Sequence, residues 1–481
     1  MKRIKTGILV AATILLGVFC ISTGHAEVNK PNIIFILADD LGWGDLGVFY
    51  QNSRDQNRKH ATPMLDKFAA EGMQLRQHYC PAPVCAPSRA SLLSGRHQGH
   101  EPIRDNQFDK ALADSHTIGT VLQTAGYRTA MVGKYGLPGG DREKYDFDEW
   151  VAYPTERGFD EFFGYVKHRD GHTQYPAHAY QRGNSELHRA PKPVFHNNQK
   201  LLDELEGCYT TDLFTAFAKN WIVEHRKTKS DQPFFLYFPL SAPHTPWLPT
   251  ADFTGKARAG YYGDFVNQCD HVIGQVVAAL KEGGHLDNTL LVVTSDNGSH
   301  WVPGDIPKYD HRANLNYRGQ KADIWEGGHR IPFLVRWPGH VKPGTSSNQT
   351  ICLTDLMATA MEITGHQVPS GAGEDSYSFL SALAGDDSKS ERDTIVHHSV
   401  NGTFAVRVGD WKLIVNNLGS GGFSAPRVVK PKEDGPGGQL YNLKDDPGET
   451  KNVWLEQETV VERLQEELKR IQTTGQSRRV E

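Results

Sequence analysis

Five apolar runs, each followed at once by polar residues or by proline and glycine, constrain the fold of this chain more than any other feature. Continuous runs of this kind are typical of strands buried on both faces of a parallel sheet. Segments with helical apolar spacing lie between them, and such alternation predicts an α/β fold with a mostly parallel sheet flanked by helices. The runs occupy residues 31–38, 126–133, 233–240, 289–295 and 331–337, and the helical segments residues 62–72, 116–125, 209–225 and 261–283.

The sequence changes character after about residue 385. Short strand-like pieces, TIVHHS, FAVRVGD, WKLIVN and QLYNL, are separated by clusters of Gly and Pro, as in a small antiparallel sheet. An amphipathic helix follows over residues 453–471, with apolar residues at positions 455, 460, 464, 468 and 471. A chain of 481 residues exceeds one ordinary domain. We therefore expect an α/β domain over residues 27–385 and a small α+β domain over residues 386–481.

Residues 1–26 are typical of a secretory signal peptide. A charged start at residues 2–5 precedes an apolar run over residues 8–20, and the Gly-His-Ala of residues 24–26 resembles a cleavage site. We expect an exported protein, periplasmic or secreted, with a retained membrane anchor as the alternative. No later apolar stretch is long enough to span a bilayer. The net charge of −5 gives no reason to expect a nucleic acid or an anionic membrane as a partner.

Polar side chains with the chemistry of a binding site follow four of the apolar runs. Open α/β sheets bind ligands along the edge formed by the carboxyl ends of their strands, so these scattered residues predict a single site. Two adjacent carboxylates converge only where a strand has stopped, which Gly42 and Gly44 permit, although a solvated turn is the alternative for such a pair. The residues are Asp39, Asp40, Lys134, His244, Asp296 and Asn297.

Residues 141–205 are rich in His, Tyr, Pro and Arg and show weak periodicity. We expect long loops over the sheet edge here, which would form a substrate cleft. Three histidines of this segment, His168, His172 and His178, are each expected to be surface residues rather than ligands when they are considered singly.

Residues 85–96, CAPSRASLLSGR, place a cysteine at the start of a short amphipathic helix that Gly95 ends. Unpaired backbone N–H groups and the positive end of the helix dipole suit an anion there, and Arg89 falls about a turn inside the helix. A buried, inert cysteine is the alternative. A cysteine-dependent phosphatase needs C-x5-R, but Ser91 stands at the arginine position. A disulfide with Cys80, or half of a zinc site, has no second C-x-x-C to support it.

The full string CAPSRASLLSGR resembles the maturation motif of type I sulfatases. Other blocks look like those of the same family, in family order: PNIIFILADDLGWGDLG, TPMLDKFAAEG, PFFLYFPLSAPHTP, DNTLLVVTSDNG, KADIWEGGHRIPFLVRWPG and QLYNLKDDPGE. The resemblance implies an alkaline-phosphatase-like fold with a large α/β domain and a small C-terminal one. It also implies that a formylglycine-generating maturation enzyme oxidises Cys85 to formylglycine, whose hydrated aldehyde is the nucleophile.

The resemblance implies a role for each matched residue. The formylglycine derived from Cys85 attacks sulfur, and the second hydroxyl of the hydrate then expels sulfate as the aldehyde reforms. Arg89 holds the hydrate, and His244 serves the leaving alcohol. Lys134 and Lys321 contact the sulfate. One divalent cation, usually Ca²⁺, is bound by hard oxygen donors that suit calcium or magnesium better than zinc. These ligands are Asp39, Asp40, Asp296 and Asn297.

One position departs from the family pattern. The family usually has G-K-W-H-L-G where residues 133–138 read GKYGLP, so that Gly136 replaces a histidine credited with helping the intermediate collapse. One hypothesis is that another histidine substitutes for it, such as His178 or His300, both of which we expect to contact the substrate. The alternatives are a step that proceeds without a histidine, and a slow or inactive protein.

The leading functional hypothesis is a sulfatase that cleaves sulfate esters of a sulfated carbohydrate. The segment 141–205 and His300-Trp301 beside the metal motif favour a carbohydrate cleft. WEGGHRIPF and DNGSHW resemble bacterial polysaccharide sulfatases, and we expect a galacto-configured sugar. The alternatives are a phosphate or phosphonate ester hydrolase on the same scaffold, and a non-catalytic binder of sulfated glycans, which Gly136 motivates.

Overall fold

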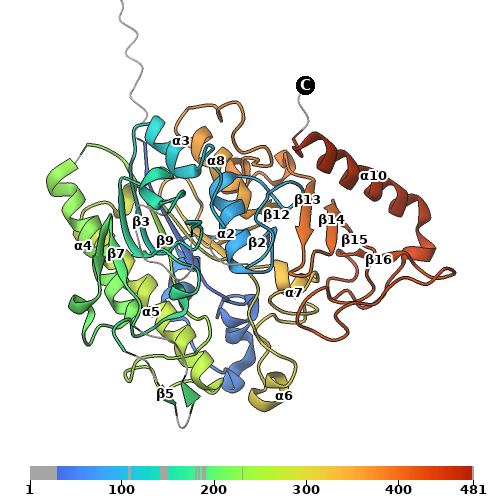
Figure 1. The fold of residues 1–481 in the computed structure, drawn as a ribbon, viewed down its shortest axis with the longest axis horizontal. Helices are drawn as coiled ribbons and strands as arrows, with labels where there is room; N and C mark the ends of the chain where they lie inside the picture. Colours follow the sequence, from blue (N-terminus) through green and yellow to red (C-terminus); the bar gives the residue numbers. More distant parts are fainter. Residues whose placement is uncertain are drawn as a thin grey trace, which may run out of the picture.

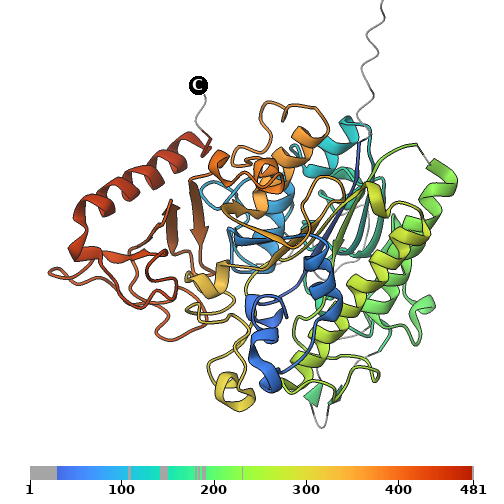
Figure 2. The ribbon, with the colours of Figure 1, turned by 180° about the vertical axis from the view of Figure 1, so that it is seen from behind.

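A computed structural model of the chain describes residues 30–106, 110–140, 150–178, 181–182, 185–186, 191–229 and 231–478. The predicted signal peptide, residues 1–26, lies outside the described residues. A large sheet covered by helices forms most of the molecule, and a smaller sheet with a long helix beside it lies at one end (Figure 1 and Figure 2). The predicted α/β architecture with a small C-terminal antiparallel sheet is confirmed.

The central strands of the large sheet are the apolar runs that the sequence indicates. The strands are β1 (Asn32–Ala38), β2 (Met73–Tyr79), β3 (Arg128–Lys134), β4 (Glu161–Tyr165), β7 (Val194–His196), β8 (Gln199–Leu201), β9 (Phe234–Pro239), β10 (Thr289–Ser295), β11 (Phe333–Arg336) and β12 (Thr345–Cys352). Their order is β12-β2-β11-β10-β1-β9-β3-β4-β7-β8. β10, β1, β9, β3 and β4 are mutually parallel neighbours. Their carboxyl ends therefore share one edge of the sheet.

Several strands differ from the sequence-based expectation. The fifth apolar run forms β11, which is antiparallel to β10, because the connection between them lacks a long crossover helix. Parts of the predicted loop region 141–205 instead extend the sheet as β4, β7 and β8. β2 and β12 were not predicted, because MQLRQHY and TSSNQTIC contain no continuous apolar run. β5 (Gln181–Arg182) and β6 (Ser185–Glu186) form a separate two-stranded sheet.

Helices cover both faces of the large sheet. Successive side chains of β1 point to opposite faces, and each face forms an apolar core with its own set of helices. The helices are α1 (Pro63–Ala70), α2 (Cys85–Ser94), α3 (Ile118–Thr124), α4 (Thr210–Lys229), α5 (Gly260–Glu282), α6 (Asp305–Tyr309), α7 (Glu326–His329), α8 (Leu356–Ile363), α9 (Leu380–Leu383) and α10 (Glu458–Thr474). Ile33 and Phe35 share a core with residues of α2, α3 and α8. Ile34 and Ile36 share the other core with residues of α1, α4 and α5.

The small sheet is antiparallel and has the order β13-β14-β15-β16. Its strands are β13 (Thr394–His398), β14 (Phe404–Val408), β15 (Trp411–Val415) and β16 (Gly438–Asn442). α10 packs on it through Val461, Leu464, Leu468 and Ile471. The prediction that Leu455 lies on the apolar face of this helix was wrong. α10 begins only at Glu458, and Leu455 is 68% exposed. The domain boundary at residue 385 stays a prediction.

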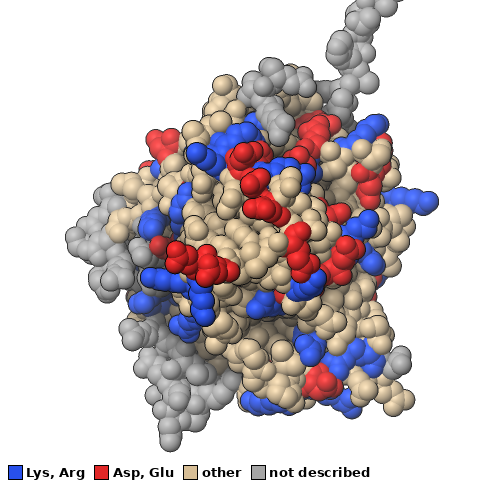
Figure 3. All heavy atoms as spheres, turned by 90° about the vertical axis from the view of Figure 1, so that its right-hand side faces the viewer, with Lys and Arg blue, Asp and Glu red and all other residues tan. Residues whose placement is uncertain are grey.

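Within the described residues, no helix combines the length and the apolar character that a bilayer span requires. On the side of the molecule that carries α10, Lys and Arg side chains are interspersed with Asp and Glu (Figure 3). This face therefore presents no field of one sign to a charged ligand.

Lys412 of β15 ties the small sheet to the large domain. Its ammonium lies 3.1 Å from Glu326 Oε1 and 2.9 Å from Glu449 Oε1, and all three side chains are fully buried. The hydroxyl of Tyr79 in β2 donates to Glu326 Oε2 at 2.7 Å. Buried charges cost several kcal/mol per ion unless they are paired, so these groups depend on one another.

We expect Lys412→Ala to lower the free energy of unfolding by about 3–5 kcal/mol, because it leaves two buried carboxylates without their cation. Lys451→Ala serves as the control. It removes an exposed ion pair with Glu456, whose atoms lie 2.9 Å apart, and should cost less than about 1 kcal/mol. Urea denaturation followed by tryptophan fluorescence measures both, and equal effects would contradict a structural role for Lys412.

Candidate active site

Asp39 and Asp40 follow the last residue of β1, and a change of backbone direction at Asp40 turns both carboxylates into the site. Asp40 has a φ of 71°, in the left-handed region that Asp tolerates better than most residues. The sequence analysis placed this turn at Gly42 and Gly44, but the structure makes it at Asp40. These glycines instead admit a second loop, since a Cβ on Gly42 would lie 2.2 Å from the carbonyl oxygen of Ala313.

Asp296 and Asn297 follow β10 in the same way. The last residues of β1 and β10 are paired in register, so the next residues of the two strands emerge side by side. Asn297 Nδ2 donates to Asp40 Oδ1 at 2.6 Å, and the backbone N–H of Asp40 donates to Asp296 Oδ1 at 3.3 Å. Asn297 Oδ1 is buried and has no hydrogen-bond partner among the described residues. The predicted cation ligands therefore lie together.

Cys85 is the first residue of α2, and its thiol donates to Asp39 Oδ1 at 3.3 Å. As expected, α2 ends at Gly95, which has a φ of 71°. Burial raises the pKa of the Cys85 thiol well above its ordinary value, and the neighbouring Asp39 adds to the shift. The thiol is therefore protonated at neutral pH, unlike the thiolate of a cysteine-dependent phosphatase. Cys80 and Cys85 are both free, which excludes the alternative disulfide.

Arg89 lies one turn into α2, is fully buried and connects the ends of three strands. Its guanidinium donates to Asp296 Oδ2 at 2.8 and 3.1 Å and to Asp39 Oδ2 at 3.2 Å. A further N–H donates to the carbonyl oxygen of Lys134 at 2.9 Å. Arg89 therefore fixes two carboxylates relative to α2, while its role in holding a hydrate stays a prediction.

Lys134 and Lys321 bring two ammonium groups to the carboxylates from different segments of the chain. Lys134 Nζ lies 2.6 Å from Asp39 Oδ2. Lys321 Nζ lies 2.7 and 2.8 Å from the two oxygens of Asp40 and 3.6 Å from the Sγ of Cys85. Both lysines are buried, so little water competes for these contacts.

The loop that carries Lys321 is held between α2 and the small domain. The backbone N–H that follows Lys321 donates at 2.8 Å to the carbonyl of Pro83, just before α2. Asp323 Oδ1 accepts hydrogen bonds from the backbone N–H groups of Phe423 at 2.7 Å and Ser424 at 3.0 Å. The small domain thus helps to position a lysine of the site.

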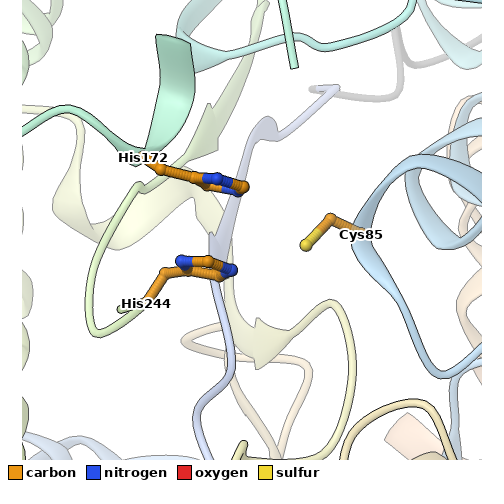
Figure 4. Close-up of side chains that lie close together, drawn as sticks. All are labelled: Cys85, His172 and His244. Carbon is orange, nitrogen blue, oxygen red and sulfur yellow. The ribbon is translucent and has the colours of Figure 1, made fainter. Parts of the chain in front are cut away.

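His244 and His172 lie stacked beside Cys85 (Figure 4). Their ring centroids are 3.8 Å apart, and the ring planes differ by 6°. A nitrogen of each ring and the Sγ of Cys85 all lie within 4.8 Å of one another. His244 Nε2 is 3.5 Å from Asp40 Oδ2, and His172 Nε2 accepts a hydrogen bond from Lys134 Nζ at 2.8 Å. Both imidazoles therefore belong to the same cluster.

His172 is the site residue that the sequence analysis missed. We expected His168 and His172 to be surface residues, but His168 is fully buried and His172 lies half-buried in the site. The only feature of the sequence that could have indicated a role for His172 was the histidine-rich stretch in which it lies. Without periodicity, its spacing does not show which side chains turn toward the sheet edge.

The two histidines expected on the substrate side lie outside the group formed with Cys85. The side chain of His178 is 62% exposed, and its Nε2 lies 2.8 Å from Glu206 Oε1. His300 is half-buried, with its ring centroid 5.5 Å from that of Phe423 in the small domain. A substrate contact by either residue stays a prediction.

The carboxylates of the site are crowded. Burial alone would raise the pKa of Asp39, but Lys134 and His244 hold it well below its ordinary value. Burial, together with repulsion from Asp39, raises the pKa of Asp296 and of Asp40. Negative charges held this close together favour a cation that contacts them directly.

The donor set fits a hard divalent cation. It offers three carboxylates and a buried amide oxygen that lacks another partner, and such oxygen ligands suit Ca²⁺ or Mg²⁺. The ammonium groups of Lys134 and Lys321 next to it suit a small oxyanion. The arrangement can therefore hold a cation and an anion against the first turn of α2.

The sulfatase family model matches residues 31–366, and a model of the C-terminal region of N-sulphoglucosamine sulphohydrolase matches residues 320–422. The chain is 31% identical to an N-acetylgalactosamine-6-O-sulfatase of Bacteroides thetaiotaomicron, over 92% of this chain and 94% of that protein. It is 32% identical to human N-acetylgalactosamine-6-sulfatase, over 74% of this chain and 66% of that protein.

A solved structure described under glycosaminoglycan metabolism by Bacteroides thetaiotaomicron has a TM-score of 0.75 to this chain and 29% identity, and covers 92% of this chain and 100% of its own. Three observations indicate the same family: the fold, the residues that converge around Cys85, and the length of these matches. The chain belongs to the sulfatase family and is a sulfuric ester hydrolase.

Proposed function

We propose that this sulfatase removes 6-O-sulfate from N-acetylgalactosamine residues of a sulfated glycan, using one Ca²⁺ and a formylglycine derived from Cys85. The observation that carries the proposal is the convergence of two lysines, a histidine and four oxygen ligands on Cys85 at the first turn of α2. The relative from Bacteroides thetaiotaomicron, matched over nearly its whole length, is an N-acetylgalactosamine-6-O-sulfatase and supports the galacto-configured sugar.

Two groups that the family implies fit this chain. Asp39, Asp40, Asp296 and Asn297 would hold the cation, which supplies Lewis-acid polarisation of the sulfate when it is bound. Formylglycine at position 85 supplies a hydroxyl nucleophile where the unmodified thiol would stay protonated. We further propose that a maturation enzyme acts on residues 85–96, and that the protein is exported after loss of residues 1–26.

The remaining steps use side chains of this chain. Lys134 and Lys321 lie within reach of an anion placed beside residue 85, and their charges would stabilise a sulfate as its negative charge grows in the transition state. His244 is positioned to donate a proton to the leaving alcohol. Because the cluster is buried, little water screens these interactions.

Peptide mass spectrometry across residues 85–96, on protein made in its native host, tests the modification. We expect the mass of formylglycine in place of cysteine, and release of sulfate from N-acetylgalactosamine 6-sulfate that exceeds release from the 4-sulfate isomer. Cys85→Ala should abolish turnover, because it removes the nucleophile. Cys80→Ala, which changes a buried cysteine outside the cluster, should retain both modification and turnover.

An intact thiol at residue 85 together with absence of sulfate release would refute this mechanism. Faster cleavage of a phosphodiester than of the matching sulfate ester would instead favour the phosphate ester hydrolase, the second hypothesis raised by the sequence.

Asp296→Asn should lower Ca²⁺ affinity by at least tenfold, because it removes a formal charge from the ligand set while keeping the side-chain shape. Isothermal titration calorimetry measures the affinity. Asp264→Asn is the control, since Asp264 accepts hydrogen bonds from the backbone N–H groups of residues 255–257 and should leave Ca²⁺ binding unchanged. Unchanged binding by Asp296→Asn would contradict the metal assignment.

Gly171→Ala should reduce kcat on the order of 10²-fold by displacing Lys134. A Cβ on Gly171 would lie 2.4 Å from Lys134 Cγ and 2.5 Å from Cδ, and the Lys134 side chain is fully buried. Gly304→Ala meets no atom within 4 Å and should behave as wild type. Steady-state kinetics with the sulfated monosaccharide compares them, and equal rates would show that the position of Lys134 is not critical.

A further inference from the structure

Phe423 is an exposed aromatic residue of the small domain that lies beside the loop carrying Lys321. It is 40% exposed, and no other described phenylalanine is as exposed. Single apolar residues are common on protein surfaces, so exposure alone indicates no function. The surroundings of Phe423 distinguish it from such a residue.

The turn that carries Phe423, residues 420–424, is fixed by hydrogen bonds on both sides of the ring. The hydroxyl of Ser420 donates to the carbonyl oxygen of Ser424 at 2.6 Å and accepts from the backbone N–H of Gly422 at 3.0 Å. The backbone N–H of Phe423 donates to Asp323 Oδ1 at 2.7 Å. The ring therefore stands on an ordered backbone, and a ligand that packs on it would not have to order the turn.

This turn lies directly on the residue that follows Lys321. A Cβ on Gly422 would lie 2.2 Å from the carbonyl oxygen of Ala322, so the two backbones approach each other as closely as a glycine permits. The ammonium of Lys321 lies 3.6 Å from the Sγ of Cys85. The exposed ring therefore stands close to a lysine of the site.

His300 contacts Phe423 and lies near the charges of the site. The two ring centroids are 5.5 Å apart, and the ring planes differ by 54°. The carbonyl oxygen of Ser299, the residue before His300, accepts the backbone N–H of Lys321 at 3.1 Å. Burial lowers the pKa of His300, and the charges of Asp40 and Lys321 also act on it. The imidazole thus connects the exposed ring to the charged cluster.

A sulfated sugar needs two kinds of contact. Its sulfate binds cations and hydrogen-bond donors, whereas its ring offers a face of C–H groups. In a galacto-configured ring the axial O4 leaves the C–H groups at C3, C4 and C5 on one side, and an apolar face of this kind packs on an aromatic ring. Phe423 and Lys321 offer these two contacts from neighbouring loops.

We propose that the apolar face of the galacto-configured ring packs on Phe423 while its sulfate reaches Lys321. Phe423 then determines which sugar the site accepts, and the small domain contributes a contact to the substrate as well as support for the lysine loop. This inference rests on the proposed function and adds a specificity-determining residue to it.

Phe423→Ala should raise KM for N-acetylgalactosamine 6-sulfate about tenfold and leave kcat unchanged, because the ring is packed equally in the bound substrate and in the transition state. Phe423→Tyr keeps the aromatic ring and should keep the wild-type KM. Val428→Ala removes another exposed side chain of the small domain and should behave as wild type. An unchanged KM in Phe423→Ala would overturn the proposal.

Inhibition by inorganic sulfate separates sugar binding from support of the Lys321 loop. Free sulfate has no sugar ring, so its inhibition constant should be the same for the wild type and for Phe423→Ala. A rise of that constant in parallel with KM would overturn the proposal in favour of a structural role for the turn.

N-acetylglucosamine 6-sulfate tests the specificity. Its equatorial O4 divides the C–H groups at C3, C4 and C5 between the two faces of the ring. The ratio of kcat/KM for the galacto substrate to that for the gluco substrate should therefore fall by about fivefold or more in Phe423→Ala. An unchanged ratio would overturn the role in specificity. Wild-type protein that releases no sulfate from N-acetylgalactosamine 6-sulfate would instead refute the proposed function.

Discussion

The carboxylate of Asp39 is the interaction on which the rest of the site depends. Its two oxygens are contacted by the thiol of Cys85, the guanidinium of Arg89 and the ammonium of Lys134. A fully buried charge costs several kcal/mol unless its partners lie within hydrogen-bond distance. The end of β1, the start of α2 and the end of β3 must therefore meet accurately, and the paired register of the central strands achieves this.

A second cluster of buried charges joins the small sheet to the large sheet's side of the molecule. Lys412 of the small sheet pairs with Glu326 and Glu449, and both glutamates lie in sequence blocks that resemble those of the sulfatase family. Asp323, two residues after Lys321, is held by backbone N–H groups of the small domain. The small sheet thus stabilises the loop that delivers the second lysine of the site.

Several parts of the fold were accessible from the sequence for clear reasons. The strand runs that precede Asp39 and Asp296 are continuous and apolar because both of their faces are buried. β2 and β12 were not predicted, because their sequences mix polar and apolar residues. Such strands are stabilised by the neighbours with which they pair, and the sequence of the strand alone does not show this pairing. Leu455 was misplaced because apolar periodicity does not show where a helix begins.

The sequence by itself determined the large parallel sheet, the small C-terminal domain and the residues that follow the strand ends, because buried strands and their polar termini leave a local pattern. Only the tertiary structure decided that His172 joins the cluster while His178 does not, that Asp40 makes its own turn, and that β11 runs antiparallel. These features depend on contacts between segments that are distant in sequence, and such contacts leave no periodicity in the segments themselves.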